Sequence, residues 1–546
     1  MVQRIGATPG DVRLWVNETK AVFKLGGMLA LTQLTAVALT TTDIAFAGRL
    51  GPTYLAAEVI ASSAIFPIFL FAQGVLAALT AMIAQDLGAR RKRGVRRSLR
   101  QGFWVAMTIS VPFMAAMWHG ETLLLWLGQD AALAALGGPY MQAIIWSFFP
   151  HFGYIILRSF IAGHSRPRAA VVIMIAGFFM NAAGNYVLMF GAFGLPRLEL
   201  VGLGLSTSFT HWFMFAALLG FCLVDRQFSR YGILVRWWRA DWPRFREIFR
   251  IGLPVGFGYL AESGMFAVAG FLIGIIDAGA LSGHAVALHV SAILFMIPFG
   301  MAQASTVRVG LAVGGGHFPR ARVSGWCGLT LTVGTALASA FVLLFFGGEI
   351  SALFLDAATL DGAAAITTAA SFLAVAAAFQ LVDGLQAVAA GALRGYKDTA
   401  IPMVIQVIGY WGIGAGAMAA LGFFTPLTGI GVWAGMALGL ACPGSPEAAV
   451  GMLLGTMLTF GLITPAIAVA LSRQVGEDLF ARAYGVIFFA WGLAGLTAPW
   501  LAGLLYDWTG GYAGALRLGL GSALAAAAAG LGMPPDPPAP PDGSAQ

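Results

Sequence analysis

Apolar runs of roughly 20 residues, each long enough to cross a bilayer core as a helix, recur from one end of this chain to the other. The chain has 546 residues, of which 59% are hydrophobic and 10% are charged. A soluble domain would carry about 25% charged residues. The runs are rich in Ala, Gly and Leu and lack the alternating pattern of barrel strands. The sequence therefore predicts an all-α polytopic membrane protein.

Twelve of these runs predict two six-helix lobes, separated by the arginine-rich linker 225–250. One constant shift superposes the starts of the two halves and sets Gly26 on Gly252 and Gly74 on Gly300. Such matches indicate a duplicated six-helix unit, and transporters built from repeats bind their substrates at the repeat interface. The expected spans are 24–46, 57–85, 101–119, 134–156, 168–192 and 202–223 in the N-lobe (24–224), and 251–276, 284–312, 325–347, 363–392, 401–421 and 428–442 in the C-lobe (251–442).

Basic residues gather in short segments at one end of the spans, mainly 89–100 and 225–250. This distribution follows the positive-inside pattern and places both segments, together with the N-terminus 1–23, in the cytoplasm. The net charge of +7 therefore reports membrane topology, and we expect no nucleic-acid partner. We expect a monomeric multi-pass protein of the bacterial inner membrane, surrounded by lipid bilayer.

The end of the chain has a different character. The sequence CPGSPE cuts the span 428–442 short of a full crossing, so the number of spans after residue 427 and the side of the C-terminus stay open. Three further apolar segments predict about three appended helices within 443–531. The Pro-rich tail, 532–546, is expected to be disordered.

Sequence motifs for catalysis are absent. The sequence contains no Walker A loop, no His-Glu-x-x-His pair and no Gly-x-Ser-x-Gly elbow. Its three cysteines are far apart and lack the spacing of metal ligands. We therefore expect a protein that is not an enzyme, needs no cofactor, and draws its energy from an ion gradient.

Three carboxylates interrupt the apolar spans: Asp43, Glu262 and Asp383. Each would cost about 2.5–3.5 kcal/mol at the centre of a membrane helix, so such residues usually face a bundle interior or a wet cavity and often mark ion pathways. The alternative is a protonated acid that bonds to a backbone carbonyl and serves packing. Glu58 lies near the outer end of its span and is expected to reach water.

Two asparagines, Asn181 and Asn185, lie four residues apart and therefore share one helix face, as do Phe379 and Asp383. The asparagines have two interpretations, a polar cavity wall or hydrogen bonds between helices. Because the charged candidates within the spans are all acidic, a cavity that they line would favour cations. The residues are consistent with exchange of an organic cation for H⁺ or Na⁺ at a shared carboxylate.

Five stretches together resemble the multidrug and toxic compound extrusion (MATE) family, in particular its NorM-type branch. The resemblance covers residues from about 20 to 441 and implies twelve helices in two six-helix lobes that form a cation antiporter. The stretches are LTQLTAVALTTTDIAFAGRLGPTYLAA, AQDLGARRKRG, FFMNAAGNYVLMFGAFGLP, IGLPVGFGYLAESGMFAVAG and DGLQAVAAGALRGYKDT.

The resemblance also implies roles for single residues. Glu262 and Asp383 match the C-lobe acids that the family associates with the coupling cation, with Na⁺ as the metal ion that these acids would bind. Phe379 stands where relatives of this branch can carry a tyrosine near that cation. Met28 replaces the family's proline in the first helix. The polar residues that match the family's N-lobe cavity are Asp43, Asn181 and Asn185.

The segment 449–531 departs from this family and resembles the last helices of major facilitator transporters of the oxalate/formate type. The matching text is VGEDLFARAYGVIFFAWGLAGLTAPWLAGLLYDWTGGY. Because three helices cannot form the central cavity of a twelve-helix transporter, no carboxylate transport is expected from them.

The sequence therefore predicts a secondary active antiporter that exports small organic cations, including drugs, in exchange for Na⁺ or H⁺. Two alternatives remain open. One is a flippase for a lipid-linked precursor, which would need basic residues along its cavity because its substrate is a pyrophosphate. The other is a non-functional fusion protein.

Overall fold

The computed structural model describes residues 12–355, 359–425 and 427–441. The chain divides into two compact units, Met1–Leu453 and Leu454–Gln546, and the described residues all belong to the first. Within the described ranges the regular structure is entirely helical, with no strand. The appended helices predicted within 443–531 and the tail 532–546 lie outside the described residues and stay predictions.

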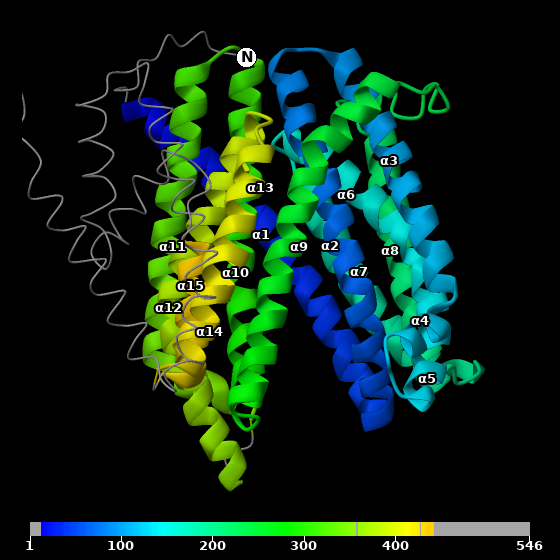
Figure 1. Cartoon of the computed structure of the whole chain (residues 1–546). Coiled ribbons are helices and arrows are strands. Elements are labelled where there is room, and N and C mark those ends of the chain that lie inside the picture. Colours follow the sequence, from blue (N-terminus) through cyan, green and yellow to red (C-terminus); the bar gives the residue numbers. More distant parts are fainter. Residues whose placement is uncertain (1–11, 356–358, 426, 442–546) are drawn as a thin grey trace, which may run out of the picture. The chain divides into compact units, whose positions relative to one another are not determined.

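The first half of the described chain forms eight helices around one apolar core. Helices α5 and α6 follow each other through the 3₁₀ turn Ile145–Ser147 and together make one span. Figure 1 shows the long helices running side by side. The helices are α1 (Val12–Leu50), α2 (Pro52–Gly88), α3 (Lys92–Trp118), α4 (Gly120–Trp126), α5 (Ala131–Ile144), α6 (Phe148–Gly163), α7 (Arg168–Phe190) and α8 (Glu199–Val224).

The second half forms the remaining described helices around a second apolar core. One span changes from α-helix to π-helix and back, at Ile408–Gly414. Its elements are α9 (Trp242–Ile276), α10 (Ala280–Gly314), α11 (Phe318–Ala352), α12 (Leu360–Gly395), α13 (Ala400–Val407), the π-helix η4 (Ile408–Gly414), α14 (Ala415–Phe423) and α15 (Thr428–Leu440).

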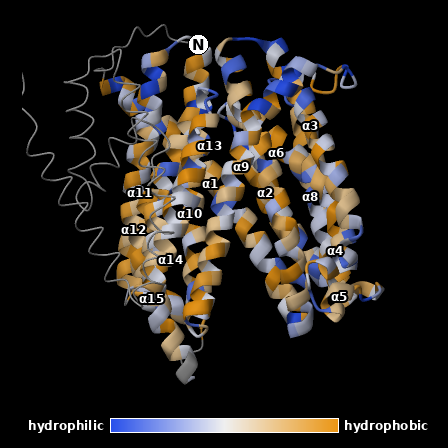
Figure 2. Cartoon of the chain, viewed as in Figure 1, coloured by the Kyte–Doolittle hydropathy of each residue, from blue (hydrophilic) through white to orange (hydrophobic). Residues whose placement is uncertain are grey.

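Ten helical segments of the described chain are long and apolar enough to cross a membrane. Figure 2 shows hydrophobic residues along the middle of these helices and hydrophilic residues concentrated toward their ends. Helix α3 is long enough but less apolar. Helix α15 has 13 residues and is about 20 Å long, which is shorter than a bilayer core. The chain is therefore a multi-pass membrane protein, and the predicted crossing at 428–442 is incomplete within the described residues.

Two helices begin earlier than the apolar pattern predicts. The predicted linker 225–250 ends at Asp241, because α9 begins at Trp242. Asp241 caps this helix by accepting a hydrogen bond from the Arg244 N–H, and Pro243 in the first turn needs no donor partner. Likewise, α1 begins at Val12, inside the predicted N-terminal segment 1–23. Charged residues near the start of each helix, such as Glu18 and Lys20 in α1 and Arg246 and Glu247 in α9, interrupt the apolar runs and hide both starts.

The two halves pack closely at one end of the bundle, where α2 meets α9 and α10. A β-carbon at Gly74 would lie 2.5 Å from the Cα atom of Gly256, so neither position has room for a side chain. Gly252 lies directly against the carbonyl of Val75 in the same way. Small residues let membrane helices approach this closely. We call this the basic end, after the arginines of 90–100 and 226–239 beside it.

Candidate functional site

A buried polar cluster joins α1, α7 and α8 in the first half of the chain. Asn185 donates a hydrogen bond from Nδ2 to Oδ1 of Asp43 at 2.6 Å, and Thr207 donates from Oγ1 to Oδ2 of Asp43 at 3.1 Å. Asn181 donates to Oγ1 of Thr207 at 3.2 Å, which closes the network. Both asparagines are fully buried. The structure thus brings the three predicted N-lobe residues together, and it adds Thr207.

This cluster keeps an unused acceptor. The amide Oδ1 of Asn185 is buried, and in the described part of the chain nothing donates to it. Because a buried acceptor without a donor costs free energy, the cluster favours a ligand that donates hydrogen bonds or carries positive charge. Thr207 escaped the sequence reasoning because a lone threonine in an apolar span is common, and only the packing of α8 against α7 identifies it.

The prediction that Glu58 reaches water is wrong, since this residue is only 3% exposed. Its Oε1 accepts a hydrogen bond from Ser62 at 2.6 Å, and the Ser62 hydroxyl lies 3.4 Å from that of Tyr140. Helix α5, which carries Tyr140, packs against α2 and covers the carboxylate. The Glu58 and Asp43 carboxylates interact electrostatically, so Glu58 adds a second acid to this region.

A second acidic site lies in the other half, where α9 and α12 bring Glu262 and Asp383 within electrostatic range of each other. Asp383 is 2% exposed, and its Oδ1 has no hydrogen-bond partner within the described ranges. Phe379, one turn earlier, packs its ring against Phe266 and Trp433, with centroids at 6.0 and 5.7 Å. Asp383 therefore lies one turn from an aromatic cluster and keeps one oxygen free for a ligand, with Glu262 nearby.

Tyr410 extends the same site with a hydroxyl group. It is 1% exposed, lies within electrostatic range of Glu262 and Asp383, and accepts a hydrogen bond from Nε2 of Gln386 at 2.6 Å. Tyr410 belongs to the π-helix η4, and such single-turn bulges often occur at functional sites. The sequence reasoning missed both residues. Gln386 could have been found, because it follows Asp383 by three residues and shares its helix face.

No hydrogen bond or ion pair within the described residues connects the Asp43 cluster with the acids Glu262 and Asp383. The two groups are therefore separate sites, one in each half of the chain. Groups of three or more His, Cys, Asp or Glu side chains that could hold a metal ion are also absent from the described residues. A metal cation at Glu262 and Asp383 would need other oxygen ligands, and the Tyr410 hydroxyl is one candidate.

Two arginines line a small cavity between the halves. Arg158 on α6 and Arg394 at the end of α12 are each 7% exposed, and the cavity of about 20 Å³ has room for a water-sized particle. Arg158 donates to Oε1 of Gln33 at 2.6 Å, while Arg394 lies 5.9 Å from the ring centroid of Tyr259. Their sequence positions give no sign that these two arginines line a shared cavity.

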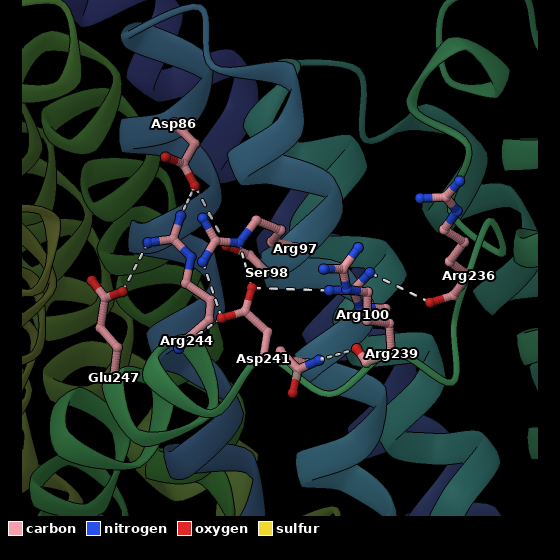
Figure 3. Close-up of polar contacts among 10 residues, drawn as sticks. Asp86, Arg97, Ser98, Arg100, Arg236, Arg239, Asp241, Arg244 and Glu247 are labelled. Atoms are coloured by element: carbon pink, nitrogen blue, oxygen red, sulfur yellow. Dashed lines mark hydrogen bonds and ion pairs between the residues drawn. The ribbon is translucent and has the colours of Figure 1, made fainter.

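Ion pairs join helices of the two halves at the basic end. Arg97 on α3 forms a bidentate pair with Asp241, and Arg244 on α9 bonds to Asp86 at the end of α2 (Figure 3). The hydrogen bond from Arg97 lowers the pKa of Asp241 below its ordinary value of 3.8. These contacts connect α2 and α3 in the first half to the start of α9 in the second.

A further ion pair spans the halves at the same end. Glu18 on α1 is 1% exposed and pairs with Arg308 on α10 and Arg320 on α11, each at 2.6 Å. Gln85 on α2 also donates to the carbonyl of Gly395, at 2.8 Å. The basic end is thus closed by charge as well as by glycine packing.

Comparison with known proteins places this architecture in a family. The family model MatE matches residues 29–187 and 254–416. The probable multidrug resistance protein NorM of Mesorhizobium japonicum is 41% identical over 431 residues, which are 78% of this chain and 92% of that protein. Its namesake from Rhizobium meliloti is 39% identical over 427 residues, again 78% of this chain and 91% of the relative.

Solved structures share the fold. The eukaryotic MATE transporter AtDTX14 superposes with a TM-score of 0.71 at 21% identity, over 82% of this chain and 97% of that one. A MOP superfamily transporter from Pyrococcus furiosus gives a TM-score of 0.70 at 19% identity, over 83% of this chain and 98% of that one. The relatives at about 40% identity are bacterial, which identifies the membrane as the bacterial inner membrane. The chain belongs to the MatE family.

Proposed function

We propose that this protein is a secondary active antiporter that exports small organic cations, including drugs, in exchange for Na⁺ or H⁺. The family and the relatives named as multidrug resistance proteins support the proposal. The proposal rests mainly on the position of Asp383. Its carboxylate is buried within a membrane span, has one oxygen without a hydrogen-bond partner in the described chain, and lies near Glu262. Intramembrane acids arranged this way characteristically mark ion pathways.

The C-lobe acids are the proposed coupling site. Two neighbouring carboxylates within membrane spans repel each other, and a bound cation or proton relieves that repulsion. A proton would bind to one carboxylate oxygen. A sodium ion would take oxygen ligands from Glu262 and Asp383, with the Tyr410 hydroxyl as a further donor of lone pairs. Phe379 contributes an aromatic ring one turn before Asp383, packed against Phe266 and Trp433, and no oxygen ligand.

The N-lobe cluster is the proposed cavity for the organic cation. Asp43 supplies the negative charge, Asn185 and Thr207 donate hydrogen bonds to its two oxygens, and Asn181 bonds to both of these donors. The free amide oxygen of Asn185 offers the exported compound a hydrogen-bond acceptor. Since this cluster and the C-lobe acids are separate, coupling would pass through movement of the lobes and not through direct contact of the two ligands.

Exchange requires the basic end, which we place in the cytoplasm, to open and close. Its ion pairs and glycine contacts hold the cytoplasmic side shut in this conformation. A cation that enters from outside and binds Glu262 and Asp383 would favour lobe movement toward the inward-open state and displace the drug. Moving one positive charge against the membrane potential costs about 2.3 kcal/mol per 100 mV. One returning monovalent cation offsets that cost.

Ethidium accumulation in cells that lack their own efflux pumps tests the assignment. Asp383→Asn and Glu262→Gln should each lower the efflux rate at least tenfold, whereas Glu349→Gln, an exposed acid on α11, should leave it unchanged. Equal efflux in all three variants would rule out the coupling site. If cells that express the chain never export ethidium but move a lipid-linked precursor to the outer leaflet, the flippase alternative replaces this proposal.

A deletion tests the remaining alternative, that the chain is a non-functional fusion. Membrane-fraction levels of the full chain and of a form lacking residues 443–546 should be compared. Equal levels and equal efflux would exclude a defect caused by the appended segment. If only the shortened form accumulates in the membrane fraction, the appended segment causes a defect.

A further inference from the structure

A pocket of about 520 Å³ opens at the basic end, between the first turns of α3 and the linker that precedes α9. The transport proposal does not use it. Six arginines and one aspartate supply its charged lining, which leaves an excess of five positive charges. We call it the arginine pocket, and its charged residues are Arg93, Arg96, Arg97, Arg100, Arg236, Arg239 and Asp241.

The backbone of the linker is held against α3 by hydrogen bonds to its carbonyl groups. Arg100 donates to the carbonyl of Arg236 at 3.4 Å, Gln101 donates to the carbonyl of Arg239 at 3.3 Å, and Trp104 donates to the carbonyl of Trp237 at 3.0 Å (Figure 3 shows the two arginine carbonyl contacts). These bonds use backbone oxygens and leave the side chains of Arg236 and Arg239 for other partners. Without a ligand, this arrangement concentrates like charges.

The acids of the neighbourhood are already engaged. Asp241 pairs with Arg97 and lies 3.9 Å from Nη2 of Arg100. Asp86 and Glu247 pair with Arg244. Arg100 is more than nine-tenths buried, and its Nε has no hydrogen-bond partner within the described chain. The pocket therefore presents unused donors as well as uncompensated charge.

Phosphate oxygens fit this arrangement, because guanidinium groups bind them through paired hydrogen bonds. Three tryptophans favour a phosphate that belongs to a lipid headgroup over a free phosphate ion. Trp242 lines the pocket and is 60% exposed, while Trp237 and Trp238 lie between the two linker arginines in the sequence and are 55% and 66% exposed. Large aromatic rings at the ends of membrane helices lie at the level of the lipid headgroups. Basic pockets at the cytoplasmic ends of membrane helices bind anionic headgroups.

We propose that the arginine pocket binds the phosphodiester headgroup of an anionic phospholipid in the cytoplasmic leaflet, with the tryptophans against its glycerol and upper acyl region. The lining comes from α3 in the first half and from the linker into α9 in the second. A bound headgroup would neutralise positive charge on α3 and on the linker and would hold these two segments together. This inference does not rest on the proposed transport function.

Native mass spectrometry of the purified full-length chain tests the site. During stepwise delipidation, phosphatidylglycerol and cardiolipin should stay bound to the protein far longer than phosphatidylcholine. The fraction of protein that retains these anionic lipids should fall as the salt concentration rises. The double variant Arg236→Gln/Arg239→Gln should bind these lipids roughly thirtyfold more weakly. The matched control Arg49→Gln/Arg197→Gln removes two arginines elsewhere on the surface and should bind them as the wild type does.

Three results would overturn the proposal. One is equal retention of anionic lipid by the double variant and the control, with both eluting as folded protein. Another is equal retention of phosphatidylcholine and phosphatidylglycerol by the wild type. The third is displacement of the lipid by millimolar inorganic phosphate, which would show that the pocket binds free phosphate and is not specific for a membrane lipid.

Discussion

At the residue scale, the free Oδ1 of Asp383 and the hydroxyl of Tyr410 define what the C-lobe site offers a cation. The apolar spans exclude water, so each oxygen atom there has a large influence on a charged ligand. The hydroxyl that Phe379 lacks is provided from another helix by Tyr410. An oxygen donor can thus be present although the sequence position where a tyrosine was expected carries phenylalanine.

Replacing Tyr410 with phenylalanine tests that role. The change removes the hydroxyl and leaves the Gln386 amide without its acceptor. We expect a loss of about 1–1.5 kcal/mol in cation binding, which raises the half-saturating concentration of the coupling cation roughly tenfold. Dye efflux measured against Na⁺ concentration and against pH gives this value. Tyr186→Phe, at a position that is 55% exposed, is the control; equal curves for both variants would remove Tyr410 from the site.

Sequence reasoning singled out the acids Asp43, Glu262 and Asp383 of the two proposed sites because charge in an apolar span is rare. It missed Thr207, Gln386 and Tyr410, since polar neutral residues are common in such spans and only packing shows which of them face an acid. It misplaced Glu58 for a related reason. Distance along the helix predicted exposure, but a neighbouring helix covers the carboxylate.

At the scale of elements, close helix contacts and ion pairs determine how the basic end closes. Helices α2 and α9 touch through glycines, and Asp241 ties the start of α9 to α3. Opening this end requires these contacts to break together. Substitutions here should therefore change the balance between conformations more than they change either binding site.

Gly74→Val should destabilise the conformation with a closed basic end. The added side chain would overlap Gly256 at the contact described above, and overpacking of this kind costs about 1–3 kcal/mol. A cysteine introduced at Thr80, which lines the cavity beside Arg158, should then react faster with a thiol reagent added from the cytoplasmic side. Gly27→Val is the control, because nothing lies within 4 Å of a β-carbon there. Equal labelling rates in the two variants would contradict the packing argument.

Asp241→Asn should remove a charge without removing the helix cap, since asparagine caps as well as aspartate does. Arg97 lowers the pKa of Asp241, so the folded state favours the carboxylate and gains stability above pH 4. That gain disappears as the pH falls through the lowered pKa. The variant should therefore be less stable than the wild type by about 1 kcal/mol at neutral pH, and this difference should shrink as the pH falls below 4.

Thermal unfolding of purified protein between pH 3 and 7 measures this difference. Asp130→Asn alters another helix cap, where the carboxylate accepts from the Ala132 N–H, and should show a smaller pH dependence. A difference between Asp241→Asn and the wild type that stays constant across the whole range would argue against the ion pair as its cause.

At the scale of the whole molecule, hydrophobicity located the ten long apolar helices of the described chain, because a span needs roughly 20 consecutive apolar residues. The division into two halves followed from the arginine-rich linker, whose end moved to Asp241 once the cap of α9 was visible. The closure of the basic end was not predictable. It depends on pairs such as Glu18 and Arg308. These residues lie far apart in the sequence, and nothing in the sequence indicates that they are in contact.

The central claim is that the C-lobe acids couple cation entry to drug export, and reconstituted liposomes test it most directly. Ethidium efflux should be followed while the Na⁺ gradient and the pH gradient are imposed separately. We predict that one of the two gradients drives efflux by the wild type and by Glu349→Gln, and that neither gradient drives efflux by Asp383→Asn. Gradient-driven efflux that persists in Asp383→Asn at the wild-type rate would contradict the account.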